Sequence, residues 1–196
     1  MQEYLASTEI IDWQNQYIRQ LARQLVGEDP NTTAKDCFEW VRDNIYHSSD
    51  YQMNPITCSA SEVLEHQTGY CYAKSHLLAA LLRANSIPTG FCYQRLSVFD
   101  NGAPYSLHGL NAVYLAEYGW YRLDARGNKP GVEAQFTPPQ EQLAYGINFP
   151  EEIDCQHVFA EPLPEVVKSL QSYHTWDRLL HNLPDVERNY LAGFKK

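Results

Sequence analysis

Residues 71–84, which read CYAKSHLLAALLRA, form the most apolar helical stretch of this chain. A helix with apolar residues on nearly every side is buried on most of them. Gly69 breaks the chain just before this segment, and Pro88 forbids the helix from continuing far beyond it. We therefore expect a fold in which the other elements pack around one central helix.

The segments that precede this helix also have helical patterns. Apolar residues at helical spacing predict one helix over 8–26 and a second over about 33–46. Residues 47–57 are polar and are expected to form a loop. Ser59 followed by Glu62 is a capping signature, which predicts a further short helix. The first part of the chain is thus expected to supply helices.

Downstream of the central helix the pattern changes to that of a sheet. Three segments are rich in aromatic and β-branched residues and are separated by turn signals: 89–99, 107–117 and 120–125. Three sequential strands with short links predict an antiparallel meander. Residues 126–160 hold several Gly and Pro residues and are expected to be mostly irregular. Apolar spacing from Pro164 onward predicts a final amphipathic helix.

These elements predict an α+β protein, with helices packed on an antiparallel sheet. We expect residues 1–196 to form a single domain, with a core at about 36–130 and helical additions at both ends. The net charge of −9, without a basic stripe, argues against a nucleic-acid partner. No signal-like segment opens the chain, and no apolar run could span a bilayer. We therefore expect a cytoplasmic protein without a membrane partner.

The chain contains five cysteines, none in a CxxC pair, at positions 37, 58, 71, 92 and 155. This spacing suggests neither a disulfide framework nor a zinc ribbon, so most of them are expected to be small buried residues. Cys71 differs because it stands in the first turn of the central helix. Free N–H groups and the helix dipole favour a thiolate there and can also hold an oxyanion. Cys71 is either a nucleophile or an inert core cysteine.

His108 stands at the start of the second predicted strand and Asp124 at the end of the third. If these strands pair across the turn at 118–119, the two side chains come close in space. An imidazole there can take a thiol proton and later protonate a leaving amine, while a carboxylate behind it orients the ring. Each residue alone also has a structural explanation. Together with Cys71, they predict a catalytic triad.

Other residues could supply parts of a site. Cys58 precedes a short helix and is a weaker candidate nucleophile. A metal site that included Cys58 would draw on three histidines whose spacing matches no common ligand pattern, namely His47, His66 and His157. Gln52 and Gln67 are candidates for a second oxyanion donor. We expect no cofactor and no metal for the triad chemistry.

Three features together resemble the transglutaminase-like superfamily. They are the TGYC sequence that ends at Cys71 and leads into the apolar helix, the histidine at 108, and the GWYRLD block that ends at Asp124. The resemblance covers about residues 36–130 and implies a papain-like core, with the nucleophile at the amino end of the central helix. By motif, Cys71 is the nucleophile, His108 the general base and acid, and Asp124 the orienting carboxylate.

Two departures from the family pattern concern the substrate cleft. Residues 109–111 (GLN) stand where many members have an aromatic residue, and Ala125 stands where many have proline. The resemblance implies acyl transfer or hydrolysis on a glutamine carboxamide or a peptide bond, through a thioester, with a peptide or protein as substrate. Both water and an amine are open as acyl acceptors. The alternative is a catalytically silent member that binds a peptide or partner protein in the same cleft.

Overall fold

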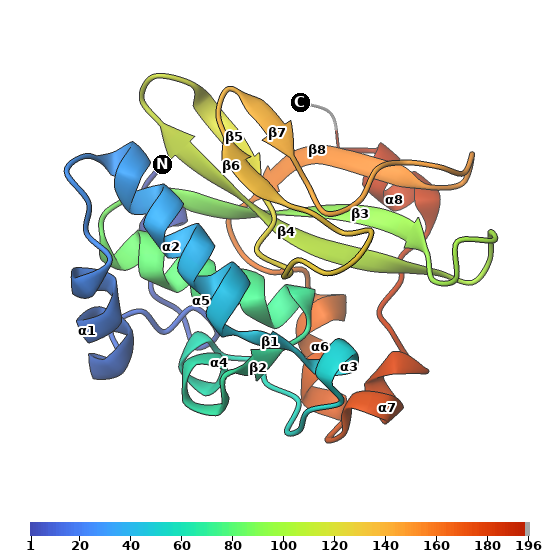
Figure 1. Cartoon of the computed structure of the whole chain (residues 1–196). Helices are drawn as coiled ribbons and strands as arrows, with labels where there is room; N and C mark the ends of the chain where they lie inside the picture. The colour runs from blue at the N-terminus through green and yellow to red at the C-terminus, as the bar shows by residue number, and fades with distance from the viewer. Residues whose placement is uncertain (195–196) are drawn as a thin grey trace.

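Figure 1 shows the computed structural model, which describes residues 1–194, as a twisted sheet lying across a layer of helices. The helices are η1 (Gln2–Leu5), α1 (Gln16–Gln24), α2 (Pro30–Asn44), α3 (Ser48–Tyr51), α4 (Ala60–His66), α5 (Cys71–Ala84), α6 (Pro164–Ser172), α7 (Trp176–Leu180) and α8 (Arg188–Ala192). The strands are β1 (Tyr46–His47), β2 (Thr68–Gly69), β3 (Thr89–Ser97), β4 (Tyr105–Leu115), β5 (Gly119–Leu123), β6 (Gln135–Thr137), β7 (Gln140–Gln142) and β8 (Ile153–Phe159).

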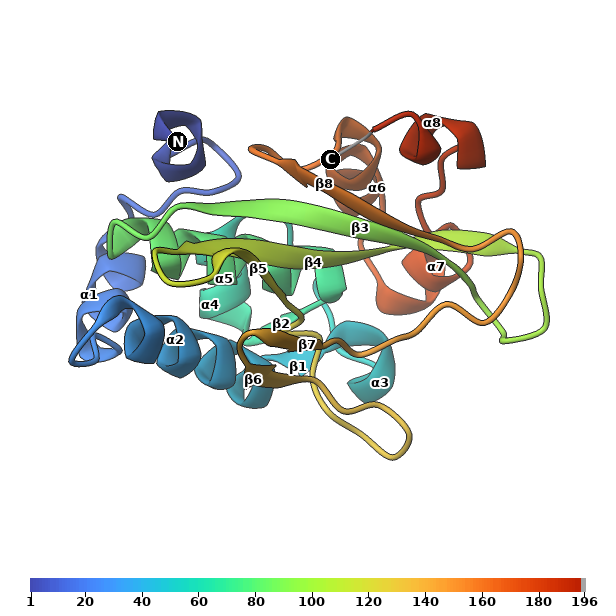
Figure 2. The same ribbon diagram turned by 90° about the horizontal axis from the view of Figure 1, so that it is seen from above.

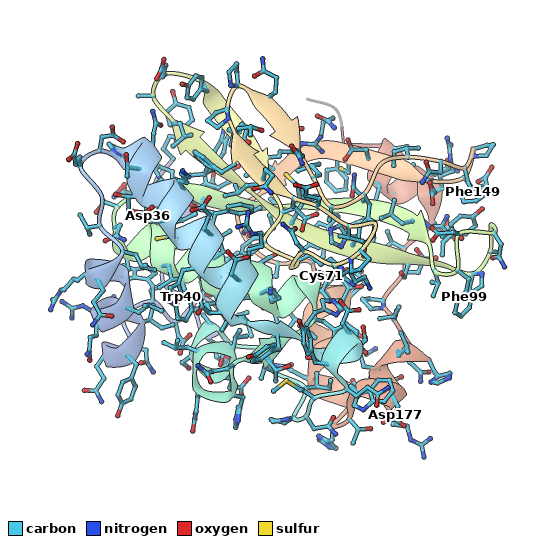
Figure 3. The ribbon with its side chains drawn as sticks, viewed as in Figure 1. Asp36, Trp40, Cys71, Phe99, Phe149 and Asp177 are labelled. Atoms are coloured by element: carbon cyan, nitrogen blue, oxygen red, sulfur yellow. The ribbon has the colours of Figure 1, made fainter. Side chains whose placement is uncertain are left out.

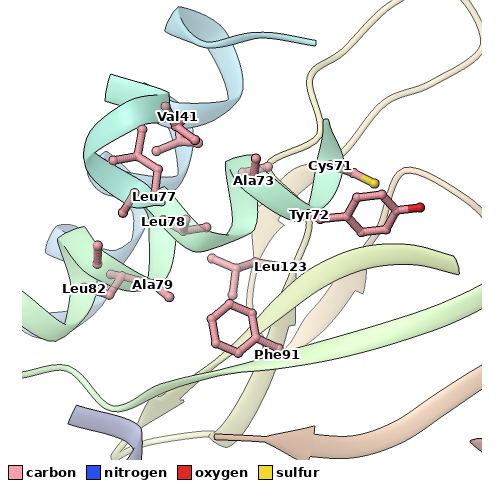
Figure 4. Packing of buried hydrophobic residues seen from close by; sticks show 14 of the residues in the cluster. Val41, Cys71, Tyr72, Ala73, Leu77, Leu78, Ala79, Leu82, Phe91 and Leu123 are labelled. Carbon is pink, nitrogen blue, oxygen red and sulfur yellow. The ribbon is translucent and has the colours of Figure 1, made fainter. Parts of the chain in front are cut away.

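The central helix is α5, with the bounds expected from the sequence, and its residues from 71 to 83 are all buried. The sheet covers one side of α5, and α1, α2 and α4 pack on the rest of it (Figure 2). Figure 4 shows Val41 of α2 beside Leu77, with Phe91 and Leu123 of the sheet on the other side of the helix. Fully burying a leucine contributes about 1.5–3 kcal/mol, so α5 is held firmly in place.

The main sheet has the strand order β5-β4-β3-β8, with antiparallel neighbours throughout. The predicted meander of three strands is confirmed as β3, β4 and β5. The expectation that 126–160 would be mostly irregular is wrong for β8 and for the hairpin of β6 and β7. β8 gains its partner from far along the chain, with Cys155 opposite Tyr93. Strand formation that depends on such a distant partner leaves little signal in the local sequence.

The first helix is shorter than predicted. α1 begins at Gln16 rather than near Thr8, because the side chain of Asn15 accepts the capping hydrogen bond from the Tyr17 N–H at 2.9 Å. Between η1 and Asn15 the chain has bends and turns, and Thr8 accepts a hydrogen bond from the Ile11 N–H. The helix predicted from apolar spacing therefore starts too early, because the residues from Thr8 to Asn15 form a loop.

The other helices agree with the prediction in part. α2 starts earlier than expected, with Pro30 in its first turn and Asp29 as its N-cap. α4 carries both hydrogen bonds of the predicted capping box, between Ser59 and Glu62. The segment expected to be a loop contains α3, and the single helix expected after Pro164 is divided into α6, α7 and α8. No helix within residues 1–194 is long and apolar enough to cross a membrane.

Candidate active site

Cys71 begins α5 directly after Tyr70, which has an extended backbone and provides no side-chain cap. The cysteine is 7% exposed, and Figure 4 shows its sulfur at the helix end, away from the apolar residues of the core. Figure 3 places Cys71 near the middle of the molecule, between the sheet and the helices. Without a side-chain cap, the first N–H groups of α5 remain free to bind a negative charge.

His108 and Asp124 lie side by side in the structure. The Nε2–H of His108 donates to Oδ2 of Asp124 at 2.7 Å, and both side chains are buried. The pairing of β4 with β5 ends at Asn111 and Leu123, so His108 lies on β4 shortly before this ladder, and Asp124 directly follows β5. The proximity predicted from strand order is thus present.

Backbone N–H groups hold the carboxylate of Asp124 from two directions. The Ala144 N–H donates to Oδ2 at 3.1 Å, and the Arg126 N–H donates to Oδ1 at 3.2 Å. Burial alone would raise the pKa of Asp124, but the charge of His108, its hydrogen bond and these N–H groups lower the pKa below its usual value. Asp124 is therefore an ionised and firmly oriented partner for the imidazole.

The second ring nitrogen of His108 is left for Cys71. Burial alone would lower the pKa of His108, but the charge of Asp124, the charge of Cys71 and the hydrogen bond with Asp124 raise it to about 10. Because Nε2 is taken by Asp124, the contact with Cys71 falls to Nδ1. The arrangement favours an imidazolium between Cys71 and the ionised carboxylate of Asp124.

Gly109 lets α5 approach β4 closely at this point. A Cβ on Gly109 would lie 2.9 Å from Cδ1 and 3.3 Å from Cα of Tyr72, the second residue of α5. The Tyr72 hydroxyl also donates to the carbonyl of Leu107, which ties the first turn of the helix to the strand that carries His108. The departure from the family pattern at 109 thus has a structural reason, since a side chain there would push Cys71 away from His108.

Tyr145 covers the outer side of the histidine and was not predicted as part of the site. Its ring meets the His108 ring edge to face, with centroids 5.0 Å apart and planes at 90°. The segment that carries it is anchored by the Ala144 N–H on Asp124 and by the Gln94 side chain, which donates to the Tyr145 carbonyl at 3.2 Å. Tyr145 lies in a stretch without periodicity, so no local pattern identifies it.

Cys71 and His108 open into a cavity of about 800 Å³. One part of its wall is polar and includes Asp50, whose carboxylate accepts hydrogen bonds from Arg126 at 2.5 Å and from Lys129 at 2.7 Å. Another part is apolar, with residues from β3, β4 and the segment around α7: Leu96, Val98, Leu107, Leu180 and Leu183.

Of the other candidate residues, His47 lines this cavity, whereas the rest do not. Cys58 is buried elsewhere, and burial raises the pKa of its thiol to about 12. Gln52 and Gln67 are exposed residues at helix ends and do not line the cavity. Within residues 1–194, no three His, Cys, Asp or Glu side chains gather as a metal site. The remaining cysteines are buried packing residues, as expected: Cys37, Cys92 and Cys155.

The family model of the transglutaminase-like superfamily matches residues 19–125, which is more than half of the chain. The protein therefore belongs to the transglutaminase-like superfamily. The matched region ends just after Asp124 and includes Cys71 and His108. No curated protein matches the chain.

Two solved structures are among those similar to this chain. A candidate cysteine protease from Cytophaga hutchinsonii is 20% identical with a TM-score of 0.50, over 63% of this chain and 40% of that one. The periplasmic domain of TgpA from Pseudomonas aeruginosa, in its ethylmercury-bound structure, is 20% identical with a TM-score of 0.43, over 56% of this chain and 43% of that one. The chain thus spans less than half the length of these proteins. The first likeness supports a shared α+β fold.

Proposed function

We propose that this protein is an enzyme that cleaves or exchanges an amide bond through a thioester on Cys71. The substrate is a glutamine carboxamide or a peptide bond in a peptide or protein, and no cofactor takes part. The observation that carries the proposal is the buried pair of His108 and Asp124, 2.7 Å apart, beside a cysteine at the uncapped start of a helix. A core cysteine without a chemical role would not need an ionised carboxylate and an imidazole at the same cavity.

In the first half of the reaction, the Cys71 thiolate attacks the carbonyl carbon of the substrate. The electron pair of the C=O bond moves to oxygen, and the N–H of Cys71 hydrogen-bonds this oxyanion. As the oxyanion collapses, the C–N bond breaks and His108 gives its Nδ1 proton to the departing amine. Asp124 keeps the ring in place throughout by accepting the hydrogen bond from Nε2–H.

In the second half, water or an amine attacks the thioester. The neutral His108 takes a proton from the attacking group at Nδ1, and the C–S bond breaks to restore the thiolate. Water as acceptor makes the enzyme a hydrolase, and an amine makes it a transferase. Both routes use the same three side chains, so the acceptor depends on what enters the cavity.

Alkylation with substoichiometric iodoacetamide near neutral pH, followed by peptide mass spectrometry, tests the nucleophile without knowledge of the substrate. Cys71 should be labelled first among the five cysteines, because it alone combines a helix N-terminus with an adjacent imidazole. The Cys58→Ala variant is the matched control and should keep this labelling. Preferential labelling of Cys58 or Cys92 would contradict the assignment.

Turnover then separates catalysis from the silent alternative. Glutamine-containing peptides are offered with and without a primary amine, and ammonia release, peptide cleavage and amine incorporation are followed. Turnover that the Cys71→Ala variant lacks would support the proposal. Peptide binding with no product in either protein would favour a silent member that uses the cavity for recognition. A cytoplasmic location is part of the same proposal, and cell fractionation with a specific antibody tests it.

A further inference from the structure

His47 is a histidine of the cavity that the triad does not use. It ends β1, which runs parallel to β2 with His47 opposite Gly69, two residues before Cys71. Its ring contacts the ring of Tyr70 with centroids 5.3 Å apart, and it lines the same cavity as Cys71 and His108. The pairing of the two short strands therefore places this imidazole next to the uncapped start of α5.

The two ring nitrogens of His47 have different surroundings. Nδ1 lies 3.1 Å from the hydroxyl of Ser49. Nε2 has no hydrogen-bond partner within residues 1–194, and the residue lines the cavity that contains Cys71 and His108. The buried nitrogen and oxygen atoms without partners in that part of the chain are on other residues, namely His76, Gln94 and Asn111. Nε2 is thus free to meet a bound substrate.

The proton of His47 is expected on Nε2. The Oδ2 atom of Asp50 is 3.8 Å from Nδ1, which is beyond hydrogen-bonding distance, and the Asp50 carboxylate is already bound by Arg126 and Lys129. The Ser49 hydroxyl therefore remains the partner of Nδ1. When it donates its proton there, the ring is held as the tautomer with hydrogen on Nε2.

The same surroundings keep the ring uncharged. Burial and the positive charge of Arg126, aided by Lys74 and Lys129, lower the pKa of His47 well below its usual value, against the opposing charge of Asp50. A neutral imidazole can donate a hydrogen bond but does not compete with His108 as an acid.

Building on the proposed acyl transfer, we propose that His47 is the second hydrogen-bond donor of the oxyanion site. Its Nε2–H and the N–H of Cys71 together hold the carbonyl oxygen of the substrate as it becomes negatively charged. Neither Gln52 nor Gln67 lines the cavity, so His47 takes the role for which those residues were considered. Ser49 is a positioning residue, because its hydrogen bond to Nδ1 keeps the proton of His47 on Nε2.

Two reagents that react with the same sulfur test this role. p-Nitrophenyl acetate acetylates Cys71 through a tetrahedral oxyanion and releases p-nitrophenolate, whereas iodoacetamide alkylates it by displacement of iodide without an oxyanion. His47→Phe should slow acetylation by about 10²–10³-fold, the usual cost of losing one oxyanion donor. The alkylation rate should stay within about twofold, because displacement of iodide forms no oxyanion.

Two further variants make the result specific. His47→Gln keeps an N–H donor near the position of Nε2 and should recover most of the acetylation rate. Ser49→Ala removes the group that fixes the tautomer and should slow acetylation by less than His47→Phe does. Thermal melts of all variants show whether the fold is kept, and Ser49→Ala and His47→Gln carry the test if His47→Phe does not fold.

The outcomes separate this inference from the proposed function. If wild-type protein is acetylated on Cys71 but His47→Phe slows both reagents equally, or neither, His47 is not an oxyanion donor. If the Cys71→Ala variant is acetylated as fast as wild type, the proposed nucleophile is wrong. Faster acetylation of wild type than of His47→Phe, with equal alkylation and rescue by Gln, supports the role of His47.

Discussion

Gly109→Ala tests whether the close contact between α5 and β4 sets the geometry of the triad. The added Cβ would lie 2.9 Å from the ring of Tyr72 and 3.3 Å from its Cα. Ordinary contact begins at 3.4 Å, so the ring must retreat by about 0.5 Å and the helix backbone by about 0.1 Å or more. The ring cannot simply swing away, because its hydroxyl is bonded to the carbonyl of Leu107.

The cost follows from overpacking and from misplacement of Cys71, the proposed nucleophile. Overpacking a well-packed core costs about 1–3 kcal/mol, and for a protein of this size each kcal/mol lowers the Tm by about 2–4 °C. A misplacement of about 1 Å can cost about 10²-fold in rate. Because the Tyr72 ring is held by its hydroxyl, its retreat of about 0.5 Å is expected to carry the first turn of α5 with it, which should cost roughly tenfold. We expect Gly109→Ala to be folded, less stable and about tenfold slower in acetylation of Cys71 by p-nitrophenyl acetate.

Urea unfolding and the acetylation rate of Cys71 measure the two effects together. Gly193→Ala is the matched control, because its backbone is helical and the nearest contacts of an added Cβ are at 3.4 Å. This control should retain wild-type stability to within about 0.5 kcal/mol and the full rate. A Gly109→Ala protein that is as stable and as fast as the control would refute the idea that this contact positions Cys71.

The remaining predictions concern the imidazole and its two neighbours. The pKa of His108 is raised mainly by Asp124, so Asp124→Asn should lower it, as an NMR titration of the ring would show. An unchanged titration would contradict the pairing. In wild type, the raised pKa of His108 adds stability that is complete below about pH 6.5 and is lost as pH rises toward 10. The lowered pKa of Asp124 adds stability that is lost as pH falls below about 3.9, and urea unfolding across pH measures both contributions. Tyr145→Leu removes the edge-to-face contact and should lower the unfolding free energy by about 0.5–1.5 kcal/mol. Tyr145→Phe keeps the ring and should keep the wild-type unfolding free energy. Equal losses in the two variants would show that the hydroxyl, and not the ring, is responsible.

The parts of the fold that the sequence predicts well are those with strong local signals. The continuous apolar run gives α5 with its correct bounds, and three aromatic-rich segments give the meander. The proximity of His108 and Asp124 is also predicted by local reasoning, because one turn joins their two strands and thereby determines which residues are neighbours. These three inferences require only nearby residues, so a single sequence suffices for them.

The parts that escaped prediction depend on contacts between distant segments. β8 is a strand because it pairs with β3, and Tyr145 reaches His108 because the N–H of Ala144 is bound by Asp124. His47 was considered only as a possible metal ligand. Its place beside Cys71 depends on two residues of β1 meeting two residues of β2, and strands this short have almost no pattern of their own.

The aromatic residue that many family members carry shortly after the catalytic histidine is absent here, yet an aromatic ring still packs on His108. The space next to that histidine is divided between two residues. Gly109 has no side chain, so the first turn of α5 packs closely against it. The ring that packs on His108 comes from Tyr145, in a segment more than thirty residues later. A departure in the motif therefore does not mean a departure in the site, because a side chain lost from one strand can be supplied through tertiary structure. What the chain has to preserve is the enclosed and oriented imidazole between Cys71 and Asp124.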